Sequence, residues 1–350
     1  MASDARALTL VRSRLFLVAA VIAAATVPAG LSAMPRDATG TPPVRHRLTY
    51  MRELRKLAGD YSGVVAIVVT PEGTWKGAAG WADLDAKRRA DPDDRFAIAS
   101  TTKTFVATVV LQLVGEGRLT LHDTVQHWLP GLFPARPQIT IRQLLNHSSG
   151  VPSDYGFTQP PLLRAKRIAA QGVSFKPGTS AEYSNSNFVL LGLIVEKVTG
   201  RPLDQVVTTR IIRRLHLRST SYGTAHAERM TPWLGTVDIL GRPVSGDGGI
   251  ISTVQDLATF FRALLGGKLL PPAQLAEMTR TIHSLTPDLD FGLGILRFRE
   301  CGGFTWGHGG EASYSNEIDV APDGSRAVVV AMNRGGLTQG DASGRLYCIR

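Results

Sequence analysis

The chain has 350 residues, of which 43% are hydrophobic and 19% charged, and its formal net charge at pH 7 is +10. This is the composition of a folded globular protein with a substantial core, and it excludes an intrinsically disordered chain. The densest basic cluster, residues 210–218, alternates arginines with aliphatic residues and lacks interleaved aromatic residues, so we expect no nucleic-acid partner. Attraction to an anionic cell envelope is the more natural use of the charge.

Residues 1–33 predict a secretory signal peptide. Arg12 and Arg14 precede an apolar run over residues 15–27, and the small residues Ser32 and Ala33 follow it. The alternative is an uncleaved anchor, which would then be the one contact with a membrane. We therefore expect an exported protein that resides outside the cytoplasm, in the cell envelope or secreted.

Residues 34–44 carry three prolines and read as a linker, and residues 45–350 form the predicted domain. A helix is expected over residues 45–58, followed by an antiparallel hairpin whose strands are residues 63–70 and 74–81. Further helices are predicted, with Gly or Pro between them, at residues 100–115, 119–129, 140–146, 186–198, 204–215 and 253–265. Strand patterns return at residues 291–296, 304–307, 313–320 and 326–332.

Strands thus open and close the domain, with helices between them. This order predicts an α+β fold in which one antiparallel sheet is assembled from both chain ends and residues of roughly 110–240 form an inserted helical lobe. Ser100 falls where the chain passes from the sheet to the helices. Because clefts between such parts are favoured ligand sites, this junction is the expected position of a functional site.

Ser100 and Lys103 are the first candidate catalytic pair. They lie three residues apart at the start of an apolar helix, so they share one helical face. On that face the Lys103 amine is beside the Ser100 hydroxyl and assists deprotonation of an otherwise weak nucleophile. The alternative is a chance S-x-x-K, because short motifs recur freely.

Tyr183 and Asn185 form the second motif, just before another apolar helix. A tyrosine in a cationic pocket can take a proton from a serine and return it to a leaving group. The alternative is that Tyr183 is a packed aromatic residue and that Ser184 or Asn185 caps the helix.

The third motif is His308-Gly309-Gly310-Glu311 in a predicted strand. Glycines in a strand allow a second backbone to approach, as an extended peptide substrate requires. We expect His308 to supply a positive field, and the backbone N–H groups of Ser100 and Glu311 to form an oxyanion hole. A satisfied turn histidine is the alternative.

Cys301 and Cys348 are the chain's two cysteines. An even number in an exported protein predicts an intramolecular disulfide, which would tie down the C-terminus. The histidines are scattered and no metal-binding spacing occurs, so we expect no metal and no cofactor.

In their order and spacing the three motifs resemble those of the serine β-lactamase and penicillin-binding-protein superfamily. Tyr-x-Asn and the late histidine make the chain similar to class C β-lactamases and secreted D-alanyl-D-alanine carboxypeptidases. His308, with Cys301 seven residues before it, looks most like the carboxypeptidase group. The resemblance runs over residues 45–350 and includes further segments at residues 80–83, 116–121, 123–130, 139–150, 176–178 and 248–253.

The resemblance implies roles for individual residues. Ser100 would form the acyl-enzyme, Lys103 would assist its activation, and Tyr183 would pass a proton to the leaving amine. Asn185 would hold Lys103 and the substrate amide, and His308 would position Tyr183 and the substrate carboxylate. Whether Lys103 or Tyr183 is the acylation base stays open from the sequence.

Two departures from the family pattern bear on specificity. Gly309 stands where the family commonly has a threonine, so a hydroxyl for the substrate carboxylate is missing, unless Arg297 or Arg299 replaces it. The separate glutamate that class A enzymes use for deacylation is also missing. We expect a D-alanyl-D-alanine carboxypeptidase that binds peptides or β-lactams, as a monomer. The alternatives are a class C-like β-lactamase, an esterase or D-amino-acid peptidase, and a non-catalytic sensor.

Overall fold

The computed structural model describes residues 40–59, 62–133, 138–223, 234, 242–284, 289–312, 314–333 and 342–349. The chain divides into two units, Met1–Ala33 and Met34–Arg350. All described residues belong to the second unit, so the predicted signal peptide and most of the predicted linker lie outside them. In the described part of the chain no helix is both long and apolar enough to span a bilayer.

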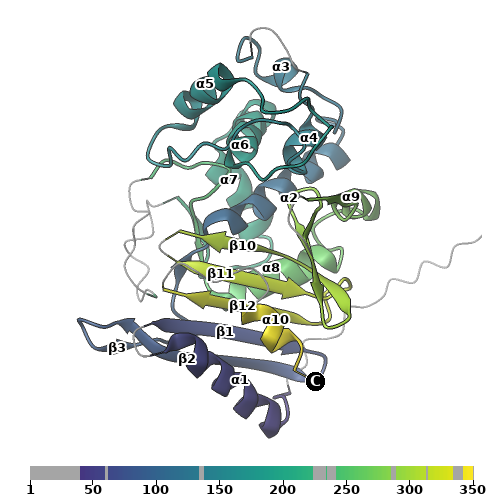
Figure 1. Ribbon diagram of the computed structural model, residues 1–350. Helices are drawn as coiled ribbons and strands as arrows, with labels where there is room; N and C mark the ends of the chain where they lie inside the picture. Colours follow the sequence, from purple (N-terminus) through teal and green to yellow (C-terminus); the bar gives the residue numbers. More distant parts are fainter. Residues whose placement is uncertain are drawn as a thin grey trace, which may run out of the picture. The chain divides into compact units, whose positions relative to one another are not determined.

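An antiparallel sheet of strands from both chain ends is the framework of the second unit (Figure 1). Among the described residues its order is β3-β2-β1-β12-β11-β10-β9-β8-β7, and every neighbouring pair is antiparallel. The strands are β1 (Gly63–Thr70), β2 (Gly73–Asp83), β3 (Arg88–Arg89), β7 (Ile282–His283), β8 (Leu289–Phe291), β9 (Leu296–Glu300), β10 (Gly303–Glu311), β11 (Ser315–Val320) and β12 (Ala327–Met332). The predicted α+β fold is thus confirmed.

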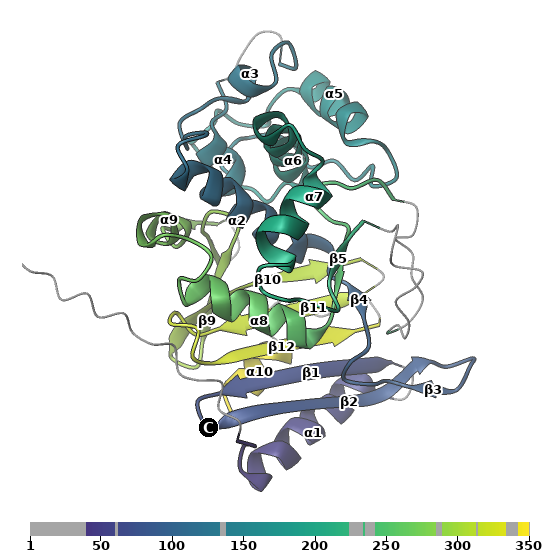
Figure 2. The ribbon, with the colours of Figure 1, turned by 180° about the vertical axis from the view of Figure 1, so that it is seen from behind.

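Strand β1 is apolar throughout because both of its faces are buried. Val65 and Ile67 contribute to the core that the sheet shares with the helices, whereas Val64 and Val68 face a second core under α1 and α10. A strand buried on both sides needs a continuous hydrophobic run rather than alternation. α8 (Val254–Leu265) covers the first face; α1 (Val44–Ala58) and α10 (Ala342–Tyr347) cover the second (Figure 2).

The helices between the two groups of strands pack around α2 (Thr102–Gly115) and α6 (Asn185–Thr199), both almost completely buried. The others are α3 (Val125–Trp128), α4 (Ile141–Leu145), α5 (Pro161–Gln171), α7 (Leu203–Val207), a π-helical turn (Thr208–Ile212) and α9 (Pro272–Met278). A second, small sheet has the strand order β4-β6-β5, and its strand β4 immediately precedes the turn that leads into α2. The strands are β4 (Phe96–Ala97), β5 (Ser221–Tyr222) and β6 (Ile250–Ser252).

Two predicted elements are wrong in extent. The expected helix 119–129 is helical only at α3, because the Asp123 carboxylate binds the backbone N–H and hydroxyl of Thr120 and closes a turn instead. The expected strand 291–296 is interrupted after Phe291. There Gly294 has a φ of +72° and Gly292 donates to the carbonyl of Ile295, which makes a turn between β8 and β9.

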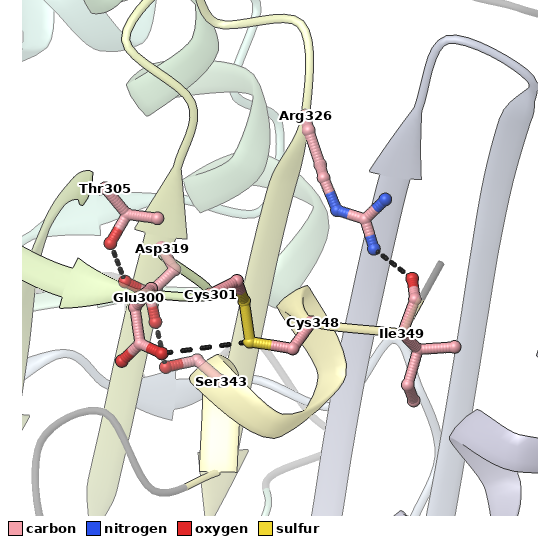
Figure 3. The surroundings of a disulfide bond; sticks show 8 residues. All are labelled: Glu300, Cys301, Thr305, Asp319, Arg326, Ser343, Cys348 and Ile349. Carbon is pink, nitrogen blue, oxygen red and sulfur yellow. Dashed lines mark hydrogen bonds between the residues drawn. A yellow bond between two sulfur atoms is a disulfide. The ribbon is translucent and has the colours of Figure 1, made fainter. Parts of the chain in front are cut away.

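A disulfide between Cys301 and Cys348 fastens the end of α10 to the turn between β9 and β10, with the two Cα atoms 5.7 Å apart (Figure 3). Beneath α10 the hydroxyl of Ser343 donates to Asp319, which Thr305 also contacts. The backbone N–H of Ser343 donates to Glu317 at 3.0 Å, and Ser343 Oγ lies 3.0 Å from the same carboxylate. The C-terminal helix is therefore held by a covalent bond and by two buried carboxylates.

Candidate active site

Ser100 lies in a short 3-10 turn, Ala99–Thr101, that leads directly into α2. Ala99 has a φ of +45°, in the left-handed region that residues with a Cβ seldom adopt. Such backbone strain persists only where neighbouring structure enforces it, and it is frequent beside reactive groups. Here Ile98 is held by a hydrogen bond from its N–H to the carbonyl of Ile250 in β6.

Lys103 is completely buried one turn further along and is surrounded by oxygen atoms. Its Nζ lies 2.8 Å from Ser100 Oγ, 2.8 Å from Asn185 Oδ1 and 3.2 Å from the carbonyl oxygen of Asp247. The predicted juxtaposition of Ser100 and Lys103 is therefore present in the structure, and Asn185 joins it from the start of α6.

This arrangement suits both protonation states of the lysine. A charged Lys103 donates one hydrogen bond to each of the three oxygens. A neutral Lys103 keeps two donors for Asn185 and Asp247 and turns its lone pair to the Ser100 hydroxyl. The same geometry therefore serves a proton transfer from Ser100 to Lys103 without rearrangement.

Tyr183 lies over this group, half-buried in the loop before α6. Its ring centroid is 5.1 Å from Lys103 Nζ and 6.3 Å from the ring of His308. The three sequence motifs, which are far apart in the chain, therefore meet at one place. Tyr183 also packs against the small hydrophobic cluster of Ala181, Phe291, Leu296 and Phe298, so it is both a packed aromatic residue and a neighbour of Lys103.

His147 is a site residue that sequence reasoning did not single out. Its ring stacks on Tyr183 with centroids 4.5 Å apart, and its Nδ1 accepts a hydrogen bond from the backbone N–H of Ser184. Burial, together with the charge of Lys103, holds the pKa of His147 well below 6.5, so the ring is neutral. The hydrogen bond from Ser184 makes His147 a support for the loop that carries Tyr183. The position of His147 in the family-like segment 139–150 is the feature of the sequence from which it could have been predicted.

His308 is buried in β10, and its Nδ1 lies 2.6 Å from the carbonyl oxygen of Gly309. Burial, followed by the charge of Lys103, lowers the pKa of His308 to about 3, although the bond to Gly309 acts in the opposite direction. The expectation that His308 supplies a positive field is therefore wrong, because a buried imidazole beside a lysine stays neutral.

Strand β10 is joined to the Ser100 turn through Asn316 of β11. Asn316 Nδ2 donates to the carbonyls of Ile98 and Gly310, and Asn316 Oδ1 accepts from Thr101 Oγ1 at 2.7 Å. A Cβ on Gly310 would lie 2.1 Å from the Ile98 carbonyl oxygen, so only glycine allows this approach. Asn316 is a further site residue that sequence reasoning did not single out.

A cavity of about 320 Å³ opens beside Ser100. Its wall includes Ser100 and Glu311, the two residues whose backbone N–H groups were predicted to hold an oxyanion. The remaining lining comes mainly from two loops and comprises Ala97, Ala99, Phe157, Arg164, Arg242, Pro243, Ser245, Asp247, Gly248, Gly249 and Ala312. A larger groove of about 1100 Å³ between α3, α5 and α6 contains none of the site residues.

Neither Arg297 nor Arg299 lines this cavity. Arg297 Nε instead donates to Asp290 at 3.0 Å, and the guanidinium lies over the ring of Phe304. Arg297 is therefore already paired with a carboxylate, and the suggestion that it replaces the hydroxyl missing at Gly309 gains no support from these contacts. Arg242, which sequence reasoning did not consider, is the arginine in the wall besides Arg164.

Metal chemistry finds little support in the described part of the chain. The group there with suitable ligand spacing is Glu300 with Cys301 and Cys348, and both sulfurs are already bonded to each other. Disulfide sulfurs are not the thiolates that bind metal ions.

The family model for Beta-lactamase matches residues 48–347, nearly the whole domain. The chain belongs to the β-lactamase family. Among solved structures, this β-lactamase-family chain is 34% identical to a D-stereospecific amidohydrolase from Streptomyces sp., covering 85% of this chain and 95% of that one, with a TM-score of 0.68.

Two curated relatives match over shorter stretches. Protein flp of Staphylococcus aureus is 33% identical over 184 residues, 49% of this chain and 36% of flp. Esterase EstB of Burkholderia gladioli is 35% identical over 191 residues, 48% of each chain. The match spans about a third of one relative and half of the other, whereas the family model covers the whole site. This β-lactamase-family protein is a serine hydrolase.

Proposed function

We propose that this exported hydrolase cleaves amide or ester bonds that follow a D-amino acid, by way of an acyl-enzyme on Ser100. The observation that carries the proposal is the hydrogen-bonded group of Ser100, Lys103 and Asn185 beside a cavity. Similarity to the Streptomyces D-stereospecific amidohydrolase along nearly the whole domain supports the stereochemistry.

In the first half of the proposed reaction Ser100 Oγ attacks the substrate carbonyl and its proton passes to Lys103 Nζ, which lies 2.8 Å away. The backbone N–H groups of Ser100 and Glu311 hold the oxygen that becomes negative. When the C–N bond breaks, the leaving nitrogen takes a proton from the Tyr183 hydroxyl, which regains one from Lys103.

In the second half a water molecule attacks the ester on Ser100 and gives up its proton to Tyr183 or Lys103. The C–O bond to Ser100 breaks, and Oγ recovers a proton from the same group. The products are a carboxylic acid and an amine, or an alcohol when the substrate is an ester. No cofactor is needed for these steps.

A D-alanyl-D-alanine carboxypeptidase is the second candidate, and Arg242 favours it. A guanidinium in the cavity wall can pair with the terminal carboxylate of a peptide. Gly309 favours the amidase instead, because it lacks the hydroxyl with which related enzymes bind that carboxylate. The two candidates therefore differ in the leaving group: the carboxypeptidase needs one that carries a carboxylate, and the amidase does not.

The test compares wild type and Ser100→Ala on three substrates: the p-nitroanilides of D-alanine and L-alanine, and diacetyl-Lys-D-Ala-D-Ala. We expect wild type to hydrolyse the D-anilide at least about tenfold faster than the L-anilide, and Ser100→Ala to be inactive. Release of D-alanine from the tripeptide as the faster reaction establishes the carboxypeptidase. Equal rates on the D- and L-anilides, or activity that survives Ser100→Ala, would contradict the proposal.

We further propose that the protein is exported by residues 1–33 and acts as a monomer. The layout of basic, apolar and small residues in that segment supports export. Cell fractionation and the N-terminal sequence of the product test it. A cytoplasmic product that retains Met1 would contradict it, and light scattering reports the molecular mass in solution.

A further inference from the structure

A buried arginine joins two loops beside the site. Arg164 of α5 is fully buried and donates hydrogen bonds from its Nε to Asp154 Oδ1 at 2.8 Å and from its Nη2 to Asp247 Oδ2 at 2.7 Å. Its Nη1 also donates to Asp247 Oδ1 at 3.0 Å and to Ser245 Oγ at 3.2 Å. One side chain therefore holds residues 152–157 and 245–249 together.

Each of these loops contacts one residue of the candidate catalytic group. The hydroxyl of Ser153, next to Asp154, accepts the backbone N–H of Asn185 at 3.1 Å. The backbone carbonyl of Asp247 accepts from Lys103 Nζ at 3.2 Å. Arg164 is thus one residue removed from Lys103, through Asp247, and two residues removed from Asn185, through Asp154 and Ser153, although it contacts neither of them.

The arginine also neutralises charge. Burial opposes ionisation of Asp154, but hydrogen bonds from Arg164 and Arg167 outweigh it and hold the pKa of Asp154 below its usual value. The Asp247 carboxylate accepts two hydrogen bonds from the Arg164 guanidinium and is also contacted by the Ser245 hydroxyl. Loss of Arg164 would leave an unpaired buried carboxylate in the residue whose carbonyl touches Lys103.

We propose that Arg164 is a positioning residue of the hydrolase, which holds the Asp247 carbonyl against Lys103 and cancels the Asp247 charge so that Lys103 can take the proton of Ser100. The inference rests on the proposed function, in which Lys103 is the base for Ser100. An uncancelled negative charge beside Lys103 would favour its protonated form, which cannot accept a proton.

The other groups around Lys103 and Arg164 do not cancel the charge of Asp247 in place of Arg164. Lys103 is faced by the hydroxyl of Ser100, the amide of Asn185 and the phenol ring of Tyr183, and by the neutral rings of His147 and His308. Arg164 is faced by Asp154, Asp247 and Ser245 and by the ring of Phe157 at 5.3 Å. The Tyr222 hydroxyl donates to the carbonyl of Ser245, and burial, with the Asp247 charge next, raises its pKa well above 10, so it stays neutral.

The test measures the acylation rate of Ser100 by a p-nitrophenyl ester between pH 5 and pH 10 in wild type, Arg164→Met and Asp247→Asn. We expect the acidic midpoint of the rate profile to rise by about one pH unit in Arg164→Met, with a rate at pH 7 lower by about 100-fold. In Asp247→Asn the positive charge is left in excess, so the midpoint should fall. Arg164→Lys, which keeps the charge but not the planar fork, should retain the wild-type midpoint at a reduced rate.

Arg210→Met is the matched control, because Arg210 also makes a two-pronged ion pair, with Glu116, at the far end of α2. Its profile should equal that of wild type. A purely structural role for Arg164 lowers the melting temperature and leaves every midpoint unchanged, and that result would overturn the inference. Should Arg164→Met not fold, a lowered midpoint in Asp247→Asn beside a wild-type midpoint in Arg164→Lys supports the inference, and wild-type midpoints in both variants overturn it. Failure of the proposed function itself would show instead as ester hydrolysis that does not depend on Ser100.

Discussion

The imidazole of His308 donates its Nδ1 proton to the carbonyl oxygen of its own neighbour, Gly309, 2.6 Å away in β10. A carbonyl can only accept, so Nδ1 carries the proton and Nε2 is an acceptor. Nε2 is buried and has no hydrogen-bond partner among the described residues. The histidine therefore offers a substrate or Tyr183 a lone pair, where the sequence led us to expect a charge.

This assignment predicts the pH dependence of a His308→Gln variant. Because the pKa of His308 is lowered to about 3 by burial and Lys103, the residue is neutral throughout the working range. We expect His308→Gln to lower kcat/KM by about tenfold, as for loss of one hydrogen bond to the reacting groups, and to leave both midpoints of the pH profile between pH 5 and pH 9 unchanged. A shift of the acidic midpoint would show that His308 titrates in that range and contradict the assignment.

Substitution of Lys103 should impair both catalysis and folding. Lys103→Met removes the proposed base and leaves Asn185 Oδ1 and the Asp247 carbonyl without their donor. We expect a loss of about 1,000-fold or more in acylation rate and a loss of about 1 to 3 kcal/mol in the free energy of unfolding. Burst kinetics with a p-nitrophenyl ester and urea unfolding measure the two effects. Lys56→Met on exposed α1 is the control and should match wild type in both measurements.

Strand β10 tolerates an added methyl group at one glycine and not at another. In Gly310→Ala the Cβ would lie 2.1 Å from the Ile98 carbonyl oxygen and 2.5 Å from Asn316 Nδ2, so β10 must move away from the Ser100 turn. A displacement of about 1 Å in reacting groups costs about 100-fold in rate, and we expect that loss in kcat/KM. In the same strand, Gly303→Ala meets no atom closer than 3.7 Å and should retain wild-type activity. Equal activity of the two variants would mean that β10 does not border the reacting groups.

The buried Glu317 predicts a stability that falls as the pH rises. Burial raises its pKa from 4.5 to about 7, although the N–H and hydroxyl of Ser343 act in the opposite direction. Between these two values the folded protein holds a proton that the unfolded chain has lost. The free energy of unfolding therefore decreases from about pH 4.5 to pH 7, by up to about 3 kcal/mol.

Glu317→Gln should reduce this slope, as measured by urea unfolding at pH 5, 6, 7 and 8. Burial also raises the pKa of the neighbouring Asp319, which adds a slope of the same sign that remains in the variant. Glu53→Gln, which alters a carboxylate on the surface of α1, should keep the wild-type slope. An unchanged slope in Glu317→Gln would contradict the assignment of the titrating group.

Loss of the disulfide should destabilise the protein without abolishing the site. Cys301 and Cys348 are 47 positions apart, and a cross-link closing a loop of this length contributes about 3 to 4 kcal/mol in the chain-entropy model. We expect Cys301→Ser/Cys348→Ser to lose about that much free energy of unfolding and to retain Ser100 acylation at low temperature. Two free thiols in the denatured wild-type protein, purified without reductant, would show that the bond does not form.

Local sequence patterns were sufficient to predict much of the fold and the motif residues of the candidate site. The continuous apolar run of β1 predicted a strand that is buried on both faces. The three-residue spacing of Ser100 and Lys103 at the start of a helix predicted that their side chains lie next to each other. The neutral state of His308 was out of reach, because a pKa depends on burial by residues that are distant in the chain. The same holds for Arg164, whose partners Asp154 and Asp247 converge only when two loops from different parts of the chain meet.

The position of β1 between β2 and β12 has a consequence for the order of folding. Its hairpin partner β2 follows at once, but Val65 pairs with Ala331, 266 residues later. During synthesis one edge of the most hydrophobic strand therefore stays open until almost the entire chain has emerged. An open apolar edge is a template for association with other chains. We therefore expect a nascent chain of this protein to be prone to association through the open edge of β1 until β12 has been synthesised.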